Sequence, residues 1–300
     1  MLISDIDRWL ALRRTGGYIL RNYELHLHRF AEFATTRKDT FIRRETAVAW
    51  ASRIRGVVPP SRFYQRLVQL SRFLHAEDPR HELLPDRYFP EPRRRPVPYI
   101  YSPAEARRLI EAAYSIRESG SILPDIVATM IGLLFATGLR ISEAVALSRG
   151  DVTSDGLIVR RAKRGKTRLV PLHPSAASAL AKYMERHPGL GTDHVFVSRQ
   201  GGPFSQPAFR RAWSVVRERA ALATYSKRSA RIHDIRHTFA VRALESAPRD
   251  RGRIGEHMLA VSTYLGHSYI ADTYWYFQHT PKLMAQISAA CRREFERGTP

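Results

Sequence analysis

The stretch Ile126-Val-Ala-Thr-Met-Ile-Gly-Leu-Leu-Phe-Ala-Thr-Gly-Leu-Arg-Ile-Ser-Glu143 joins a long apolar run to an abrupt polar end. The run favours a buried helix that stops at Gly138, since glycine commonly ends helices. Arg140 then begins the next helical segment, where a buried guanidinium could meet a phosphate beside free backbone N–H groups. Glu143 lies three residues further on the same helical face and could hold Arg140 in place. Taken alone, the pair is more typical of an ordinary surface contact.

Beyond this stretch the hydrophobic period changes from helical to that of a β-hairpin. Leu157-Ile-Val159 and Leu169-Val170 flank the polar segment Lys163-Arg-Gly-Lys166, which is a hairpin pattern. A lysine at such a tip could protonate a departing oxygen, although a basic, solvated turn is the simpler interpretation. Gly165-Lys-Thr167 resembles the end of a P-loop, but Arg160 stands where that motif requires glycine, which argues against nucleotide hydrolysis.

Further along, His233-Asp-Ile-Arg-His237 places a histidine and an arginine on one helical face. His233 and Arg236 could therefore converge on one anion. The competing interpretation is a zinc site through His233 and His237, but a metalloprotease needs glutamate after the first histidine, and Arg236 would repel a cation. No carboxylate cluster suited to magnesium is evident in the sequence, so we expect neither a metal nor another cofactor.

A fourth segment, Leu265-Gly-His-Ser268, precedes an aromatic run that contains Tyr274, Trp275 and Tyr276. Most of these rings are expected in the core. One exposed tyrosine near several cations would have its phenolate favoured and could act as a nucleophile.

Composition points to a polyanionic partner. The 300 residues carry 49 basic and 28 acidic side chains, a formal charge of +21, and only six of the basic residues are lysine. Arginine suits phosphate because its planar fork can bind two oxygens, and nucleic acid is the natural partner. The single cysteine, Cys291, excludes an internal disulfide and a cysteine-based zinc module. The chain start lacks a signal-peptide pattern and no apolar run approaches a membrane span, so we expect a cytoplasmic protein without membrane contact.

Helical periodicity and proline spacing predict two domains. Residues 1–92 show helical blocks that predict a small domain of about four helices, and residues 93–101 form a proline-rich connector. Residues 102–300 form a larger, mostly helical domain with a small antiparallel sheet, to which His194–Val197 could add a strand. Ser102-Pro-Ala-Glu105 is typical of a helix start, with serine at the N-cap, proline at N1 and glutamate at N3.

The four segments, taken in this order, resemble the signature of the tyrosine recombinase or phage integrase family. The likeness rests on Thr-Gly-Leu-Arg140, on Lys163 before Arg-Leu-Val-Pro-Leu, on the His233-x-x-Arg236-His237 box, on Leu-Gly-His267, and on Tyr276 nine residues later. It covers roughly residues 100–280, and residues 5–90 resemble the family's helical, SAM-like core-site-binding domain. Any one motif is weak, whereas five in register are specific.

The resemblance implies a mainly α fold and a reaction that needs neither metal nor ATP. Arg140 and Arg236 would bind the scissile phosphate, and His267 would donate a hydrogen bond to it. Tyr276 would attack, leaving a 3′-phosphotyrosyl link and a free 5′-hydroxyl. Lys163 would protonate that leaving oxygen and His233 would assist proton transfer from the tyrosine, while Glu143 would support the pocket.

The resemblance also implies double-stranded DNA as partner and four protomers assembled on two DNA sites. The segment after Tyr276 could dock on a neighbouring protomer as a C-terminal helix, and another recombinase or an accessory protein could take part. The stretch from Arg236 to His267 is several residues longer than is usual in the family and contains the polar insert Pro248–Arg253. This insert could contact DNA or a partner, but a solvated loop is the favoured interpretation. Basic residues near the motifs are candidate DNA contacts: Arg93, Arg94, Arg95, Arg164, Lys166, Arg168, Arg210 and Arg211.

Two alternatives remain open at this point. A type IB topoisomerase would use a very similar pocket, although the separate helical domain favours recombination. A sequence-specific DNA-binding protein without catalysis is a second alternative, against which every pocket position carries a chemically competent residue. The target site, the mobile element or replicon, and the choice among integration, excision and resolution are not written in the sequence.

Overall fold

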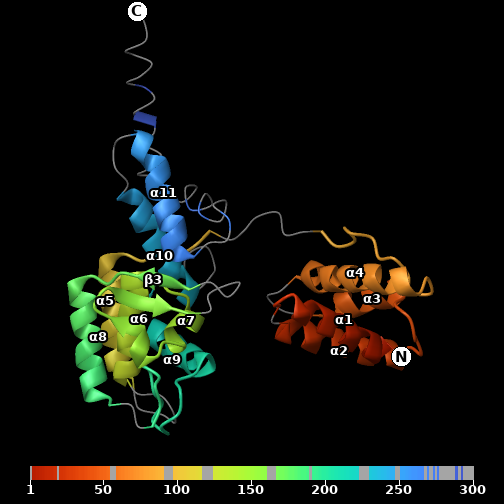
Figure 1. The fold of residues 1–300 in the computed structure, drawn as a ribbon, viewed down its shortest axis with the longest axis horizontal. Helices are drawn as coiled ribbons and strands as arrows, with labels where there is room; N and C mark the ends of the chain where they lie inside the picture. The colour runs from red at the N-terminus through yellow and green to blue at the C-terminus, as the bar shows by residue number, and fades with distance from the viewer. Residues whose placement is uncertain are drawn as a thin grey trace, which may run out of the picture. The chain divides into compact units, whose positions relative to one another are not determined.

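The computed structural model divides the chain into two compact units, Met1–Pro96 and Val97–Pro300. It describes residues 2–18, 20–54, 59–90, 97–116, 124–160, 167–188, 191–222, 230–246 and 251–266, and single residues Tyr269, Thr273, Tyr276, Ser288, Ala289 and Arg292. The division falls inside the proline-rich stretch. In the described parts, the first unit contains helices alone and the second combines helices with a small sheet (Figure 1).

The N-terminal unit consists, in its described residues, of α1 (Leu2–Thr15), α2 (Arg21–Thr36), α3 (Arg44–Arg53) and α4 (Pro60–Glu77). Apolar residues from each helix form one core, which includes the fully buried Leu10, Leu27, Phe30, Ala51 and Leu67. The prediction of about four helices is confirmed. Two large apolar residues of this unit, Tyr18 and Leu25, face solvent, with 55% and 48% of their surface exposed.

The C-terminal unit is mainly helical, and the predicted fold class is confirmed. Its described elements are α5 (Pro103–Tyr114), α6 (Pro124–Thr137), α7 (Ile141–Val145), the 3-10 turn η1 (Arg149–Asp151), β1 (Val152–Thr153), β2 (Gly156–Val159), β3 (Arg168–Val170), α8 (Pro174–Arg186), α9 (Gln206–Arg219), α10 (Ile232–Glu245) and α11 (Arg251–Leu265).

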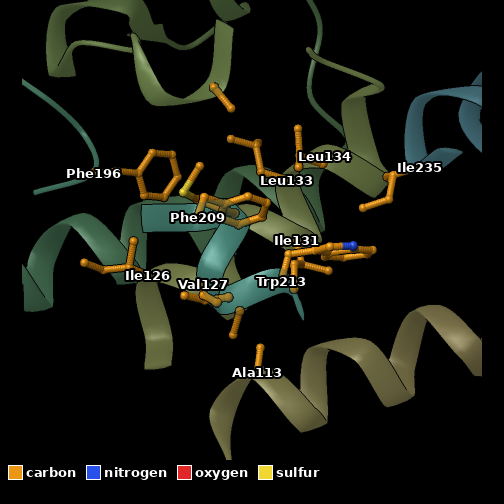
Figure 2. Packing of buried hydrophobic residues seen from close by; sticks show 14 of the residues in the cluster. Ala113, Ile126, Val127, Ile131, Leu133, Leu134, Phe196, Phe209, Trp213 and Ile235 are labelled. Atoms are coloured by element: carbon orange, nitrogen blue, oxygen red, sulfur yellow. The ribbon is translucent and has the colours of Figure 1, made fainter. Parts of the chain in front are cut away.

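Helix α6 lies at the centre of this unit because it is apolar on nearly every side. Figure 2 shows Ile131, Leu133 and Leu134 of α6 among side chains from other elements, including Trp213 of α9 and Ile235 of α10. Buried on several sides, α6 provides a rigid support, and its C-terminal end leads directly into the segment that carries Arg140.

Helix α5 begins as the sequence predicts. The Ser102 hydroxyl accepts a hydrogen bond from the backbone N–H of Glu105, and the Glu105 carboxylate accepts one from the backbone N–H of Ser102. Pro103 occupies the first turn, where its missing N–H has no helical partner to lose. The predicted capping box is confirmed.

The small sheet is antiparallel, in the order β1-β2-β3, with Leu157 opposite Val170 and Val159 opposite Arg168. Both predicted hairpin strands are therefore present, and the tip between them, residues 161–166, lies outside the described residues. The predicted strand at His194–Val197 is wrong. Isolated bridges from Ser148 to His194 and from Val197 to Pro203 stand in its place.

The predicted loop at Pro248–Arg253 is wrong in its second half. Helix α11 already starts at Arg251, while Pro248, Arg249 and Asp250 lie outside the described residues. Among the helices of the described ranges, none combines the length and apolar character that crossing a membrane requires.

Candidate active site

The site is built on two helix ends, each followed by a glycine in the left-handed region. Helix α6 gives way to Gly138 with φ +61°, and α11 gives way to Gly266 with φ +65°. A Cβ on Gly138 would lie 2.6 Å from Cδ1 of Phe239, so this position needs glycine for its backbone angle and for its packing. Carbonyl groups at such helix ends carry partial negative charge and attract cations.

Arg236 of α10 joins these two helix ends. Its side chain donates hydrogen bonds to the carbonyl of Gly138 at 2.8 Å and to that of Leu265 at 2.5 Å. The residue is only 2% exposed. Burial, and then the positive charge of Arg140, lower the pKa of Arg236 to about 10. The guanidinium thus remains charged at neutral pH and is held rigidly.

Arg140 caps the start of α7 and is held by Glu143. The carboxylate accepts one hydrogen bond from the Arg140 side chain and one from its backbone N–H, both at 2.9 Å. The Glu143 side chain is only 7% exposed and that of Arg140 27%, so the contact is a partly buried pair and not an ordinary surface pair. Burial raises the pKa of the Glu143 carboxyl, but hydrogen bonds from Arg168 and from the Arg140 backbone, together with both positive charges, lower it to about 2.

Arg168 differs from its interpretation as a DNA contact. Its side chain is 11% exposed and pairs with Glu143 at 2.8 Å, while its Nε donates to the backbone carbonyl of Tyr264 at 2.8 Å. The guanidinium therefore makes its hydrogen bonds within the protein. Sequence could not reveal this, because the contacts join residues far apart in the chain.

His233 lies at the start of α10, one turn before Arg236. Although solvent reaches the side chain, burial by surrounding protein, followed by the charges of Arg236, Arg231 and Arg140, lowers the pKa of His233 to about 4. The ring is therefore neutral at physiological pH and can accept a proton. It meets the ring of His237 edge to face, with 4.6 Å between the centroids.

Tyr276 lies beside the same helix. Its hydroxyl and Nδ1 of His237 are 3.2 Å apart. The prediction of an exposed tyrosine is wrong: Tyr276 is 3% exposed and packs with Ala240 of α10 and Leu265 of α11. In the sequence, His237 stands out as a possible metal ligand and as part of the family box, and nothing there indicates its contact with Tyr276.

A cavity of about 520 Å³ opens beside His233 and Arg236. Arg210, a candidate DNA contact, lines it, whereas Arg211 is exposed on α9 and is not part of the lining. Arg217, which was not among the predicted DNA contacts, also lines the cavity, and its spacing of seven residues from Arg210 places both on one face of α9. The full lining consists of Leu139, Ile141, Arg210, Trp213, Arg217, Ala230, Arg231, Ile232, His233 and Arg236.

The structure brings together Arg140, Glu143, His233, Arg236 and Tyr276. The remaining candidates fall outside the described residues: Lys163 and His267 of the pocket, and Arg93, Arg94, Arg95, Arg164 and Lys166 of the DNA contacts. Within the described part of the chain, no three His, Cys, Asp or Glu side chains are grouped so that they could hold a metal ion.

Arg140, His233, Arg236 and Tyr276 thus lie close together around α10 and the start of α7. The family model described as the phage integrase family matches residues 102–282. The chain therefore belongs to the phage integrase family and is an enzyme of the tyrosine recombinase type.

Known relatives cover most of the chain. A Sinorhizobium fredii protein named integrase/recombinase y4rB is 31% identical over 308 residues, covering 97% of this chain and 97% of its own. A second protein of the same organism, y4rE, is 30% identical over 300 residues, covering 95% and 94%. Tyrosine recombinase XerD of Chlorobaculum tepidum is 38% identical over 153 residues, which cover 49% of this chain and 46% of its own.

Solved structures share the fold. The XerH site-specific recombinase bound to a palindromic difH substrate aligns with a TM-score of 0.65 at 18% identity, covering 89% of this chain and 78% of its own. A lambda integrase dimer bound to a core site aligns with a TM-score of 0.63 at 18% identity, covering 94% and 77%.

Proposed function

We propose that this chain is a site-specific DNA recombinase that cuts and rejoins DNA through a covalent link to Tyr276. One observation carries the proposal. Helix α10 holds His233, Arg236 and His237, of which Arg236 is fixed beside the Arg140 segment through Gly138 and His237 contacts the Tyr276 hydroxyl. Anion-binding groups and a nucleophile thus meet around one helix. Family membership agrees with this assignment.

Arg140 and Arg236 bind the scissile phosphate in this proposal. Charge builds on the phosphate oxygens as the phosphorus becomes pentacoordinate, and preorganised cations stabilise that charge without reorganising. Glu143 and the two helix-end carbonyls hold the guanidiniums in advance. His267, next to Gly266, would add a hydrogen bond to the same group. The reaction then needs neither metal nor ATP.

Tyr276 supplies the nucleophile. Its oxygen attacks phosphorus, the bond to the 5′-oxygen breaks, and a 3′-phosphotyrosyl link and a 5′-hydroxyl result. The phenolic proton passes to neutral His233, with His237 holding the hydroxyl, and Lys163 protonates the leaving oxygen. Because the link retains the phosphodiester's energy, a 5′-hydroxyl from a second duplex can reverse the step.

A covalent-capture experiment tests the proposal. The DNA sites are first selected from random duplex DNA by binding to the full chain. Each selected duplex is then nicked at successive positions and labelled at its 5′ end. It is incubated with protein in EDTA without ATP. With wild type, the labelled DNA is expected to migrate with the protein on denaturing gels. The reason is that the strand labelled at its 5′ end becomes joined to the protein through its 3′-phosphate. Tyr276→Phe should lose the adduct and Tyr274→Phe should keep it. An adduct that survives Tyr276→Phe, or none with wild type, contradicts the proposal.

Strand exchange is distinguished from simple relaxation with a supercoiled plasmid that carries two enriched sites. Recombinant products are expected, whereas relaxation alone would identify a topoisomerase. Binding without an adduct or relaxation would identify a DNA-binding protein without catalysis.

We further propose four protomers on two DNA sites, with the segment after Tyr276 docking on a neighbouring protomer and with movement of a mobile element or replicon as the outcome. The fold supports this, since a lambda integrase tetramer bound to a Holliday junction aligns with a TM-score of 0.62. Ultracentrifugation with a duplex that carries one site should give a complex of four protomers and two duplexes, and a chain ending at residue 280 should not form it. DNA-acting chemistry also implies a cytoplasmic location.

A further inference from the structure

Arg168 is a largely covered arginine, with its side chain 11% exposed, that joins three elements of the second unit. From β3, its Nε donates to the carbonyl of Tyr264 near the end of α11. Its two terminal nitrogens donate to the two carboxylate oxygens of Glu143 on α7, at 3.1 and 2.8 Å. A guanidinium alone offers three donors in such a fixed plane, whereas lysine offers one point charge.

Glu143 is shared between Arg168 and Arg140. The Glu143 Oε1 that accepts from Arg140 at 2.9 Å also accepts from Arg168 at 3.1 Å. Among the described residues, Glu143 is the only side chain that accepts a hydrogen bond from Arg140. Two guanidiniums around one carboxylate leave a net positive charge. Without Arg168, the Glu143 carboxylate would neutralise Arg140 and weaken its pull on a phosphate.

Arg168 also touches the turn that precedes His267. A Cβ built on Gly266 would lie 3.0 Å from Nη1 of Arg168, so the backbone at this glycine lies directly against the guanidinium. The neighbouring Leu265 carbonyl accepts from Arg236. Two arginines therefore fix consecutive carbonyls, those of Tyr264 and Leu265, at the end of α11.

We propose that Arg168 is a positioning residue for DNA cleavage: it sets the charge and orientation of Arg140 through Glu143 and fixes the end of α11 that leads to His267. This inference rests on the proposed function. In this role Arg168 does not contact DNA, as the sequence had suggested, but acts within the protein. Its substitution should therefore slow the cleavage step and leave the affinity for DNA unchanged.

Single-turnover cleavage of the nicked duplex and its binding affinity separate the two roles. Arg168→Gln is expected to bind DNA as tightly as wild type but to cleave about 100-fold more slowly, the scale of loss from a misplaced catalytic group. Arg168→Lys, which keeps the charge without the planar fork, should recover part of the rate and provides a milder change should Arg168→Gln fail to fold. Arg160→Gln is the control, because it removes an exposed arginine, directly after β2, from another buried carboxylate, that of Asp151 in η1.

The pH dependence adds a readout that altered folding would not change. In wild type, the pKa of Glu143 is about 2, so the carboxylate stays ionised at every pH well above 2. Without Arg168, burial should raise that pKa, so cleavage by Arg168→Gln should fall as the pH is lowered through a range where the wild-type rate is not limited by Glu143. Three results would overturn the inference: weaker DNA binding with a normal cleavage rate, an equal loss in Arg160→Gln, or an unchanged acid limb. Absence of any wild-type adduct would instead refute the proposed function.

Discussion

At the scale of single residues, His233 has a proton affinity set by its neighbours. We expect its ring to titrate near pH 4 in the free protein, well below the usual 6.5, because burial and the charges of Arg236 and Arg231 disfavour the imidazolium. A lowered pKa keeps the ring neutral at every pH well above 4, and it also makes the ring a weaker base than an ordinary histidine. Histidine NMR with His233→Gln for assignment measures the midpoint.

Two further variants check the cause. Arg231→Gln removes one positive charge and frees Asp234, its partner at 2.7 Å, and both effects should raise the His233 midpoint. Arg210→Gln changes a cation of the same cavity that is not among the causes of the shift, and it should leave the midpoint in place. A wild-type midpoint near 6.5 contradicts the electrostatic account.

The sequence predicted contacts of this site where the two residues are close together in the chain. Arg140 and Glu143 are three residues apart at the start of α7, so their contact follows from helix geometry. The Tyr276 contact with His237 spans 39 residues, and no periodicity encodes it. Arg168 follows a basic tip and looks like another exposed cation, until the packing of β3 against other elements buries it.

At the scale of elements, the end of α6 is expected to tolerate no side chain at Gly138. Gly138→Ala combines a left-handed backbone angle with a 2.6 Å approach to Phe239. Strain of about 1–2 kcal/mol and overpacking of about 1–3 kcal/mol should together lower the free energy of unfolding of the second unit by ~2–5 kcal/mol. Urea unfolding of the full chain measures the loss.

Gly201→Ala separates the two causes. Gly201 also has a left-handed angle, φ +83°, but a Cβ there would meet no atom within 4 Å. This variant should therefore show the backbone strain alone, about 1–2 kcal/mol. Equal losses in the two variants would mean that contact with Phe239 contributes nothing.

Element boundaries followed the sequence where side chains near in the chain set them. Ser102 and Glu105 close a capping box that their spacing predicts. The segment 194–197 looked like a strand, yet it forms only isolated bridges, because strand formation depends on a partner elsewhere in the chain. The polar start of α11 at Arg251 was misread because charge alone does not distinguish a solvated helix face from a loop.

At the scale of the whole molecule, the charge of +21 should dominate DNA affinity. Each phosphate contact releases counterions, so affinity is expected to fall by at least about 10³-fold between 50 and 200 mM salt. Arg210→Gln and Arg217→Gln, which alter the cavity beside His233, should each reduce the salt slope by about 1. Arg186→Gln, on α8 and outside that lining, should leave the slope unchanged. Fluorescence anisotropy with a labelled duplex measures the salt slopes of the three variants and of wild type. Equal slopes for Arg210→Gln and wild type would show that Arg210 of this cavity does not contact DNA.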